Sequence, residues 1–257
     1  MEKVLEVEFE SFETSVPEIL EKSGLASLIA NQKRIIIKPN LTIDKKPPCT
    51  TPVELVEEVI KFCKNIIPEA KIIIVEGAGG CDTQLAFKKL SYNELAEKYQ
   101  IKLTDLNREK RVKRADERAK AIKEVMLPEI IFSGFFINLP VLKEHHEAIL
   151  TCAAKNLFGI YLNESKPPGI TSDYWSKNEL HSKYGVMKAI WDLNLYRPSD
   201  FVLVDASIGQ KGSEVYGEPC KTPIKKLFAG YNNFEVDRYC APYLGIDPNK
   251  VEYLTYQ

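Results

Sequence analysis

The chain has 257 residues, of which 44% are hydrophobic and 28% are charged, as in an ordinary globular protein with a substantial core. Its 35 basic and 36 acidic side chains nearly cancel, so charge gives no reason to expect binding to nucleic acid or to an anionic membrane. No apolar run approaches the roughly 18 residues of a membrane span. The first residues, MEKVLEVEFE, alternate like a strand and lack a signal-peptide pattern, so we expect a cytoplasmic protein.

The first half of the chain alternates predicted strands and helices. Short β-branched runs predict buried strands at 33–40, 70–76 and 101–107. Residues 51–66 predict a helix that begins with a capping box, formed by Thr51 as the N-cap, Pro52 at N1 and Glu54 at N3. The face of this helix that we expect to be buried carries Val56, Val59, Ile60 and Cys63.

A Gly-rich loop follows the second strand and leads into helical segments that extend to Tyr99. This alternation implies parallel strands with right-handed crossovers. The basic cluster at 107–120 also contains acidic residues, which indicates a solvated hairpin or helix face and not an RNA-binding patch. Further strands are predicted at 121–128 and 131–140.

The pattern changes after Asn138. We expect a helix at 148–158 that ends at Gly159, a polar loop at 160–175 and a helix at 181–196. A strand at 200–209 precedes a closing strand and helix at 224–230 and 233–245. The whole chain, 1–257, is thus predicted to be a single α/β domain. It has an open, mostly parallel sheet sandwiched by helices, with a helical and loop insertion after the Asn138 strand, at about 144–198.

The ends of the predicted strands carry a set of polar residues. Ligands of open parallel sheets bind beyond the carboxyl ends of the strands, and the sequence places there Lys38, Asn40, Thr42, Glu76, Gly77, Gly79, Gly80, Asp82, Asn138, Lys143, His145 and Asp205. Thr151 and Lys155 are four residues apart and are expected to share a helix face, with Asn156 beside them. Lysine suits a carboxylate or phosphate and histidine suits proton transfer near neutral pH. The set therefore predicts a site for a small anionic molecule.

Other kinds of site fit the sequence less well. The loop GAGGCD is not G-x-G-x-x-G, because position 82 is Asp, which argues against a Rossmann dinucleotide site; its backbone amides could still cradle an anion. Three histidines with only two close together do not predict a metal site. The six cysteines lie at least 14 residues apart and form no zinc or ferredoxin motif. We therefore expect reduced thiols and no iron–sulfur cluster held by this chain alone, and the cofactor is left unknown.

Several segments resemble, in the same order, the landmarks of the DUF362 family: IIIKPNL, INLPVLKEHH, TCAAKNLFG, the later His181, VLVDASIG and LFAGYNNFEVDRYCAPYLG. The resemblance covers nearly the whole chain. Many members of that family carry a ferredoxin-like iron–sulfur module, so the resemblance implies a stand-alone member with a ferredoxin-like protein as a candidate partner. The chain departs from the family pattern at 209–219, and it has Asn233 where the closing motif has Asp, although Asp237 is retained.

The layout is also similar to that of the nickel-dependent lactate racemases. His145 lies ten residues before Lys155, and His181 follows, an order similar to the histidines that flank the cofactor-carrying lysine of those enzymes. The Gly-Gly-x-Lys context of the racemases is absent, because Ala153 and Ala154 precede Lys155. The similarity implies acid–base chemistry on a hydroxy or keto acid, and whether a covalent cofactor is used is left open.

Three functional hypotheses follow. The leading one is an enzyme, of isomerase-like, lyase-like or redox-associated type, in which Lys38, Lys143 and Lys155 neutralise a small anion while His145, with His181, moves protons. The second is an accessory or cofactor-binding protein that partners a ferredoxin-like protein. The third is a plain anion- or nucleotide-binding module. The oligomeric state is left open, with the loop at 160–175 as a candidate lid or an interface between copies.

Overall fold

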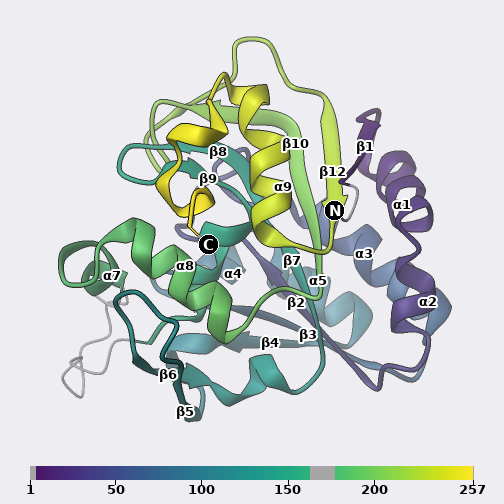
Figure 1. The fold of residues 1–257 in the computed structure, drawn as a ribbon. Helices are drawn as coiled ribbons and strands as arrows, with labels where there is room; N and C mark the ends of the chain where they lie inside the picture. The colour runs from purple at the N-terminus through teal and green to yellow at the C-terminus, as the bar shows by residue number, and fades with distance from the viewer. Residues whose placement is uncertain (1–3, 163–176, 257) are drawn as a thin grey trace.

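A mixed β-sheet forms the centre of the protein. The computed structural model describes residues 4–162 and 177–256, and in it the main sheet has the strand order β1-β12-β10-β7-β2-β3-β4 (Figure 1). The strands from β10 to β4 run parallel, whereas β12 and β1 add to the edge antiparallel. In chain order these strands are β1 (Leu5–Glu8), β2 (Arg34–Pro39), β3 (Lys71–Glu76), β4 (Lys102–Asp105), β7 (Phe135–Leu139), β10 (Phe201–Lys211) and β12 (Lys226–Gly230).

Helices cover both faces of the sheet, because its central strands are apolar on both sides. In β2, Ile35 and Ile37 pack with α1 (Phe12–Ser23), α2 (Leu25–Ile29), α3 (Val53–Ile66), α4 (Thr83–Lys89) and α5 (Tyr92–Tyr99). The intervening Ile36 points to the other face and joins the core formed with α6 (Ala153–Asn156), α8 (Val186–Tyr196) and α9 (Asn233–Cys240). This period of two is that of a strand buried on both faces. The predicted α/β class with a mostly parallel, sandwiched sheet is confirmed.

The basic segment folds as a hairpin, one of the two forms expected for it. Strands β5 (Arg111–Ala115) and β6 (Glu124–Pro128) form a separate two-stranded antiparallel sheet. Its far end is attached to α8 by Asp192, a fully buried side chain that accepts hydrogen bonds from the backbone N–H groups of residues 120–122. Among the described residues, every helix is too short or too polar to traverse a lipid bilayer.

The predicted helix at 148–158 is wrong in its first half. The chain after β7 forms a hairpin of β8 (Val141–His145) and β9 (Ile149–Thr151), in which Lys143 pairs with Thr151 and His145 with Ile149. Only α6 and the 3-10 turn Leu157–Ile160 are helical, so Gly159 lies inside that turn and does not follow a helix. Pairing of β8 with β10 fixes this hairpin, and such long-range pairing overrides local helix preference.

Three other boundaries differ from the sequence prediction. The Thr51 hydroxyl does not cap α3; Pro52 is the N-cap residue, without a side-chain cap. The expected helix at 181–196 is two helices, α7 (Asn178–Ser182) and α8, separated at Gly185 with a φ of 79°. Strand β10 extends to Lys211 and pairs with the short β11 (Glu218–Pro219). The predicted loop at 160–175 lies outside the described residues from 163 onward.

Candidate functional site

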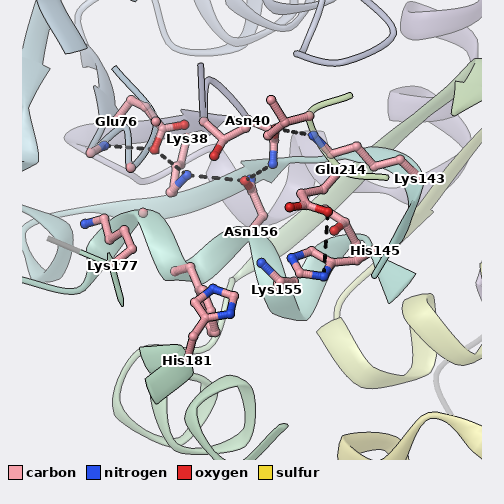
Figure 2. A pocket seen from close by; sticks show the side chains of 18 of the residues that line it. Lys38, Asn40, Glu76, Lys143, His145, Lys155, Asn156, Lys177, His181 and Glu214 are labelled. Atoms are coloured by element: carbon pink, nitrogen blue, oxygen red, sulfur yellow. Dashed lines mark hydrogen bonds and ion pairs between the residues drawn. The ribbon is translucent and has the colours of Figure 1, made fainter. Parts of the chain in front are cut away.

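A cavity of about 190 Å³ lies beyond the carboxyl ends of β2 and β3, between β8, α6 and α7 (Figure 2). The sequence-predicted residues that line it are Lys38, Asn40, Thr42, Gly77, Gly79, Gly80, Lys143, His145, Thr151, Lys155, Asn156 and His181. Parallel strands bring these distant segments to one edge of the sheet, as the strand-end rule requires. Glu76, also expected at the strand ends, lines the cavity as well. Residues that were not predicted from the sequence complete the wall: Phe158, Gly159, Lys177, Asn178, Glu214 and Val215.

The floor of the cavity holds a buried ion pair. The Lys38 ammonium donates to Glu76 Oε1 at 2.8 Å, and both side chains are at most 2% exposed. Burial lowers the pKa of Lys38 and the nearby Glu76 carboxylate opposes that shift. Glu76 also accepts hydrogen bonds from the backbone N–H groups of Leu41 and Gly77, each at 2.8 Å. The pair is therefore fully satisfied within the protein and fixes the ends of β2 and β3 together.

Three asparagine side chains connect the strand ends to α6. Asn156 Oδ1 accepts from Asn40 Nδ2 at 2.8 Å, and Asn156 Nδ2 donates to Asn138 Oδ1 at 2.7 Å. Asn138 in turn donates to the carbonyl of Ala153 at 2.9 Å. From the other side, the Asp237 carboxylate accepts from the first two N–H groups of α6, at 2.6 and 3.2 Å. This short helix, which carries Lys155, is thus held at both ends by buried side chains.

Lys143 is the second buried lysine of the cavity. Its side chain is 1% exposed, and its ammonium donates to the Cys49 carbonyl at 2.7 Å and to Asn40 Oδ1 at 3.3 Å. Burial lowers its pKa to about 8. A lysine ammonium carries three N–H donors, so one remains for a ligand.

Lys155 is in a different situation. Within residues 4–162 and 177–256 its ammonium has no hydrogen-bond acceptor and no ion-pair partner, and it lies 4.3 Å from the centre of the Phe158 ring. Burial lowers its pKa to about 7; the Glu214 carboxylate opposes this shift and the Lys143 charge adds to it. Figure 2 shows the Lys155 side chain beside the His145 ring.

All three histidines of the chain lie together, and two of them, His145 and His181, line the cavity. The His145 ring stacks on the His146 ring at a centroid distance of 4.9 Å and on the His181 ring at 5.9 Å. His145 is buried, and its Nδ1 accepts from the backbone N–H groups of Glu147 and Ala148 at 3.0 and 3.1 Å. The proton of the neutral ring therefore sits on Nε2. Burial and the nearby Lys155 charge lower its pKa well below the ordinary value.

Two glutamates bind the outer histidines. Glu214 accepts from His146 Nδ1 at 2.9 Å, which raises the pKa of His146. Burial is the largest influence on Glu214 and raises its pKa, but the His146 hydrogen bond, a backbone hydrogen bond and the nearby His146 and Lys155 charges together outweigh burial, so this carboxyl has a lowered pKa. Glu147 lies 2.8 Å from His181 Nδ1, and this contact lowers the pKa of Glu147.

Three backbone amides of the Gly-rich loop donate within the protein. The Gly77 amide donates to Glu76, the Ala78 amide to Thr83 Oγ1 and the Gly80 amide to the Thr42 carbonyl. The glycines also allow close packing. A Cβ on Gly77 would lie 2.3 Å from the Gly159 carbonyl oxygen, and a Cβ on Gly159 would lie 2.6 Å from the Lys38 ammonium.

Two sequence-predicted carboxylates do not line the cavity. Asp82 is the N-cap of α4, where it accepts from the Leu85 amide, and it forms an ion pair with Arg108 at 2.9 Å. Asp205 lies in the middle of β10 and accepts from the Ser207 amide at 2.9 Å. Both predictions assumed that a carboxylate at a strand end or in a turn is free to bind a ligand. In the structure each accepts a hydrogen bond from a backbone amide. The pairing of Thr151 with Lys155 on one helix face was also wrong, since Thr151 belongs to β9, although both line the cavity.

One group in the described part of the chain has the composition of a metal site: His145, His146 and Glu214. A metal ligand needs a free lone pair. His145 Nδ1, 3.8 Å from Glu214 Oε2, already accepts two backbone hydrogen bonds. The donor set at this place therefore fits hydrogen bonding better than metal coordination.

The family model DUF362, a domain of unknown function, matches residues 35–242. The chain belongs to the DUF362 family. The predicted resemblance is confirmed, and the match contains every residue of the cavity wall. A comparison of this DUF362 chain with curated proteins finds no match.

Among solved structures, this DUF362 chain is similar to the lactate racemase apoprotein from Thermoanaerobacterium thermosaccharolyticum, with a TM-score of 0.44 and 14% sequence identity. The similarity covers 90% of this chain and 54% of the racemase chain. The chain thus spans about half the length of that racemase. At this TM-score we base no conclusion about this chain on the likeness.

Proposed function

We propose that this DUF362 chain is an enzyme that performs acid–base chemistry on a small carboxylate or phosphate held in the cavity at the strand ends. The observation that carries the proposal is Lys155, an amine without a described partner in a cavity where the other lysines donate to protein oxygens. A lysine with a pKa near 7 exists in both protonation states at neutral pH, which is the requirement for a general acid or base.

Charge and size support a small anionic substrate. The wall contains four lysines, Lys38, Lys143, Lys155 and Lys177, against two glutamates, Glu76 and Glu214. An excess of positive charge in a partly enclosed space attracts an anion. The volume of about 190 Å³ lies below the roughly 300–1,000 Å³ of pockets for drug-sized ligands, which suits a metabolite of a few carbon atoms better than a nucleotide.

We propose different roles for the two central residues than the sequence suggested. Burial, the nearby Lys155 charge and the two amides that already donate to Nδ1 all favour a neutral His145. It therefore serves as a fixed Nε2–H donor to a substrate oxygen, and Lys155 becomes the group that exchanges the proton. Thr151, whose buried hydroxyl has no described partner, offers one more hydrogen bond at the cavity wall. A partner of ferredoxin type stays a prediction from the family.

Proton transfer can be tested without knowing the product. The protein is incubated in D₂O with a panel of small hydroxy acids, keto acids and phosphorylated acids, and deuterium entry at carbon is followed by NMR. We expect exchange in at least one acid, reduced by about 100-fold or more in Lys155→Met. Lys188→Met is the matched control, because Lys188 is exposed on α8. Equal exchange in Lys155→Met and the control, or no exchange with any acid, would contradict the proposal.

A further inference from the structure

Lys155 differs from the other cavity lysines in what its nitrogen contacts. Lys38 is bound to Glu76, Lys143 to the Cys49 carbonyl and Lys177 to Asn107 Oδ1 at 3.2 Å. Each of these nitrogens is directed at fixed protein oxygens. The Lys155 nitrogen instead lies over the Phe158 ring and faces the cavity, with no described acceptor. An amine in such a place can direct its lone pair at a ligand.

We propose that Lys155 captures a carbonyl group of the substrate as an imine, so that the substrate class is a small keto acid or an anionic aldehyde. This inference rests on the proposed function and deepens it, because it specifies which anionic metabolites the site takes and how Lys155 acts on them. A desolvated lysine in an apolar or cationic setting is the usual form of a carbonyl-capturing amine. Both features occur here, in Phe158 and in the neighbouring Lys143.

The step balances without an oxidant or reductant. The neutral Lys155 nitrogen attacks the carbonyl carbon, forms a C–N bond and yields a carbinolamine. The nitrogen loses its protons to the former carbonyl oxygen, which leaves as water, and a C=N bond replaces C=O. The His145 Nε2–H donor can hold that oxygen during the transfer, since His145 Nδ1 is fixed as an acceptor. The third N–H of Lys143 remains for the carboxylate or phosphate.

Formation of the imine would also make the proton on the carbon next to the former carbonyl group easier to remove. A C=N bond, protonated on nitrogen, withdraws electrons from the adjoining C–H bond and acidifies it. Because the Lys155 nitrogen is bonded to carbon in the imine, Glu214, half-buried in the cavity wall with a lowered pKa, takes over from it as the group that accepts that proton. The deuterium exchange proposed above would then pass through the covalent adduct.

Reductive trapping tests the inference. The full chain is incubated with pyruvate, glyoxylate or glyceraldehyde 3-phosphate and sodium cyanoborohydride, which reduces an imine to a stable secondary amine. We expect one adduct per chain with at least one of these probes. Its mass gain should equal the probe less one oxygen atom, and peptide mapping should place it on Lys155. Lactate, which lacks a carbonyl, should give none.

The controls separate a site from general lysine reactivity. Lys188→Met should be trapped like the native chain, whereas Lys155→Met should lose the adduct by at least tenfold while it melts at a temperature no lower than that of the native chain. No adduct from any of the three probes, or an adduct spread over surface lysines, would overturn the inference. Lys155-dependent deuterium exchange without trapping would leave the proposed function standing and remove the imine. Trapping on Lys155 without exchange would support the imine and count against acid–base turnover.

Discussion

Lys38 and Lys155 face the same cavity with the same side chain in opposite surroundings. Lys38 is neutralised by Glu76 and hydrogen-bonded to the Pro39 carbonyl at 3.0 Å. Lys155 has no described partner. Its positive charge lies near the Phe158 ring and near Lys143, which destabilises the folded state. Uncompensated charges in partly buried sites destabilise folding and persist where function needs them. This contrast is the main reason for assigning the reactive role to Lys155.

Replacing Lys155 with Met should therefore stabilise the protein, in a pH-dependent way. At about pH 6 the lysine is charged in both the folded and the unfolded state, and the folded state carries the whole cost of its lowered pKa. As the pH rises from about 7 toward 10.5, the folded-state amine is neutral while the unfolded one is still charged, so the native chain gains stability. We expect Lys155→Met to be more stable by about 1–2 kcal/mol at low pH.

Urea unfolding of the native chain and Lys155→Met at about pH 6 and about pH 9 checks this. The advantage of the Met variant should shrink at the higher pH. The same advantage at both pH values would mean that the lysine is not desolvated in the folded protein.

The opposite outcome is expected for the ion pair. Glu76→Gln leaves the buried Lys38 without its charged partner, and breaking a buried pair costs about 3 kcal/mol or more. Glu54→Gln in the first turn of α3, an exposed position, is the matched control and should change stability by less than about 0.5 kcal/mol. If denaturant unfolding gives the two variants equal stability, the Lys38–Glu76 pair does not hold the strand ends together.

At the scale of elements, the site depends on side chains that join the ends of strands. The Thr51 hydroxyl, expected to cap α3, donates instead to the Leu139 carbonyl at 2.7 Å and accepts from the Asn40 amide at 2.8 Å. It thus connects the ends of β2 and β7 where Asn40 enters the cavity. The β8–β9 hairpin adds Ile149 in the left-handed region with a φ of 66°, an unusual conformation for a β-branched residue. Such strain persists where surrounding contacts fix it, and here it lies beside His145.

Thr51→Val should therefore lower the free energy of unfolding by more than the loss of a helix cap would. Both hydrogen bonds disappear and the buried Asn40 N–H is left without its acceptor, so we expect a loss of about 2 kcal/mol. Thr51→Ser keeps the hydroxyl and should retain most of the stability. Thermal or denaturant unfolding of the three proteins separates the two cases. A Val variant as stable as the Ser variant would show that the hydroxyl does not tie the strands.

At the scale of the whole molecule, the sequence predicted what depends on local pattern and periodicity. The apolar runs of β2, β3 and β7 determined the parallel sheet, and the strand-end rule then brought Lys38, Lys143 and His145 to one edge. Glu214 and Lys177 could not be found in this way. They reach the cavity from a loop after β10 and from the start of α7, and only tertiary packing places those segments. The signal for Glu214 was the departure of 209–219 from the family pattern.

The prediction of a helix over 148–158 was wrong in its first half for the same reason. Its residues favour a helix locally, and pairing of β8 with β9 and β10 decides the outcome. The neutral state of His145 also could not be predicted from the sequence, because it depends on burial, on two backbone amides and on the lysine that the fold places beside it.

The most direct test of the account is the titration of Lys155 itself. Trace labelling of the native chain with acetic anhydride, from about pH 5 to about pH 11, modifies only neutral amines, and peptide mass analysis reports each lysine separately. We predict that Lys155 gains reactivity around pH 7, well below the value of about 10.4 for a lysine in a model peptide. If Lys155 gains reactivity only near that model-peptide value, its ammonium keeps its charge at neutral pH. It could then neither exchange protons nor capture a carbonyl there, and the proposed site chemistry would be wrong.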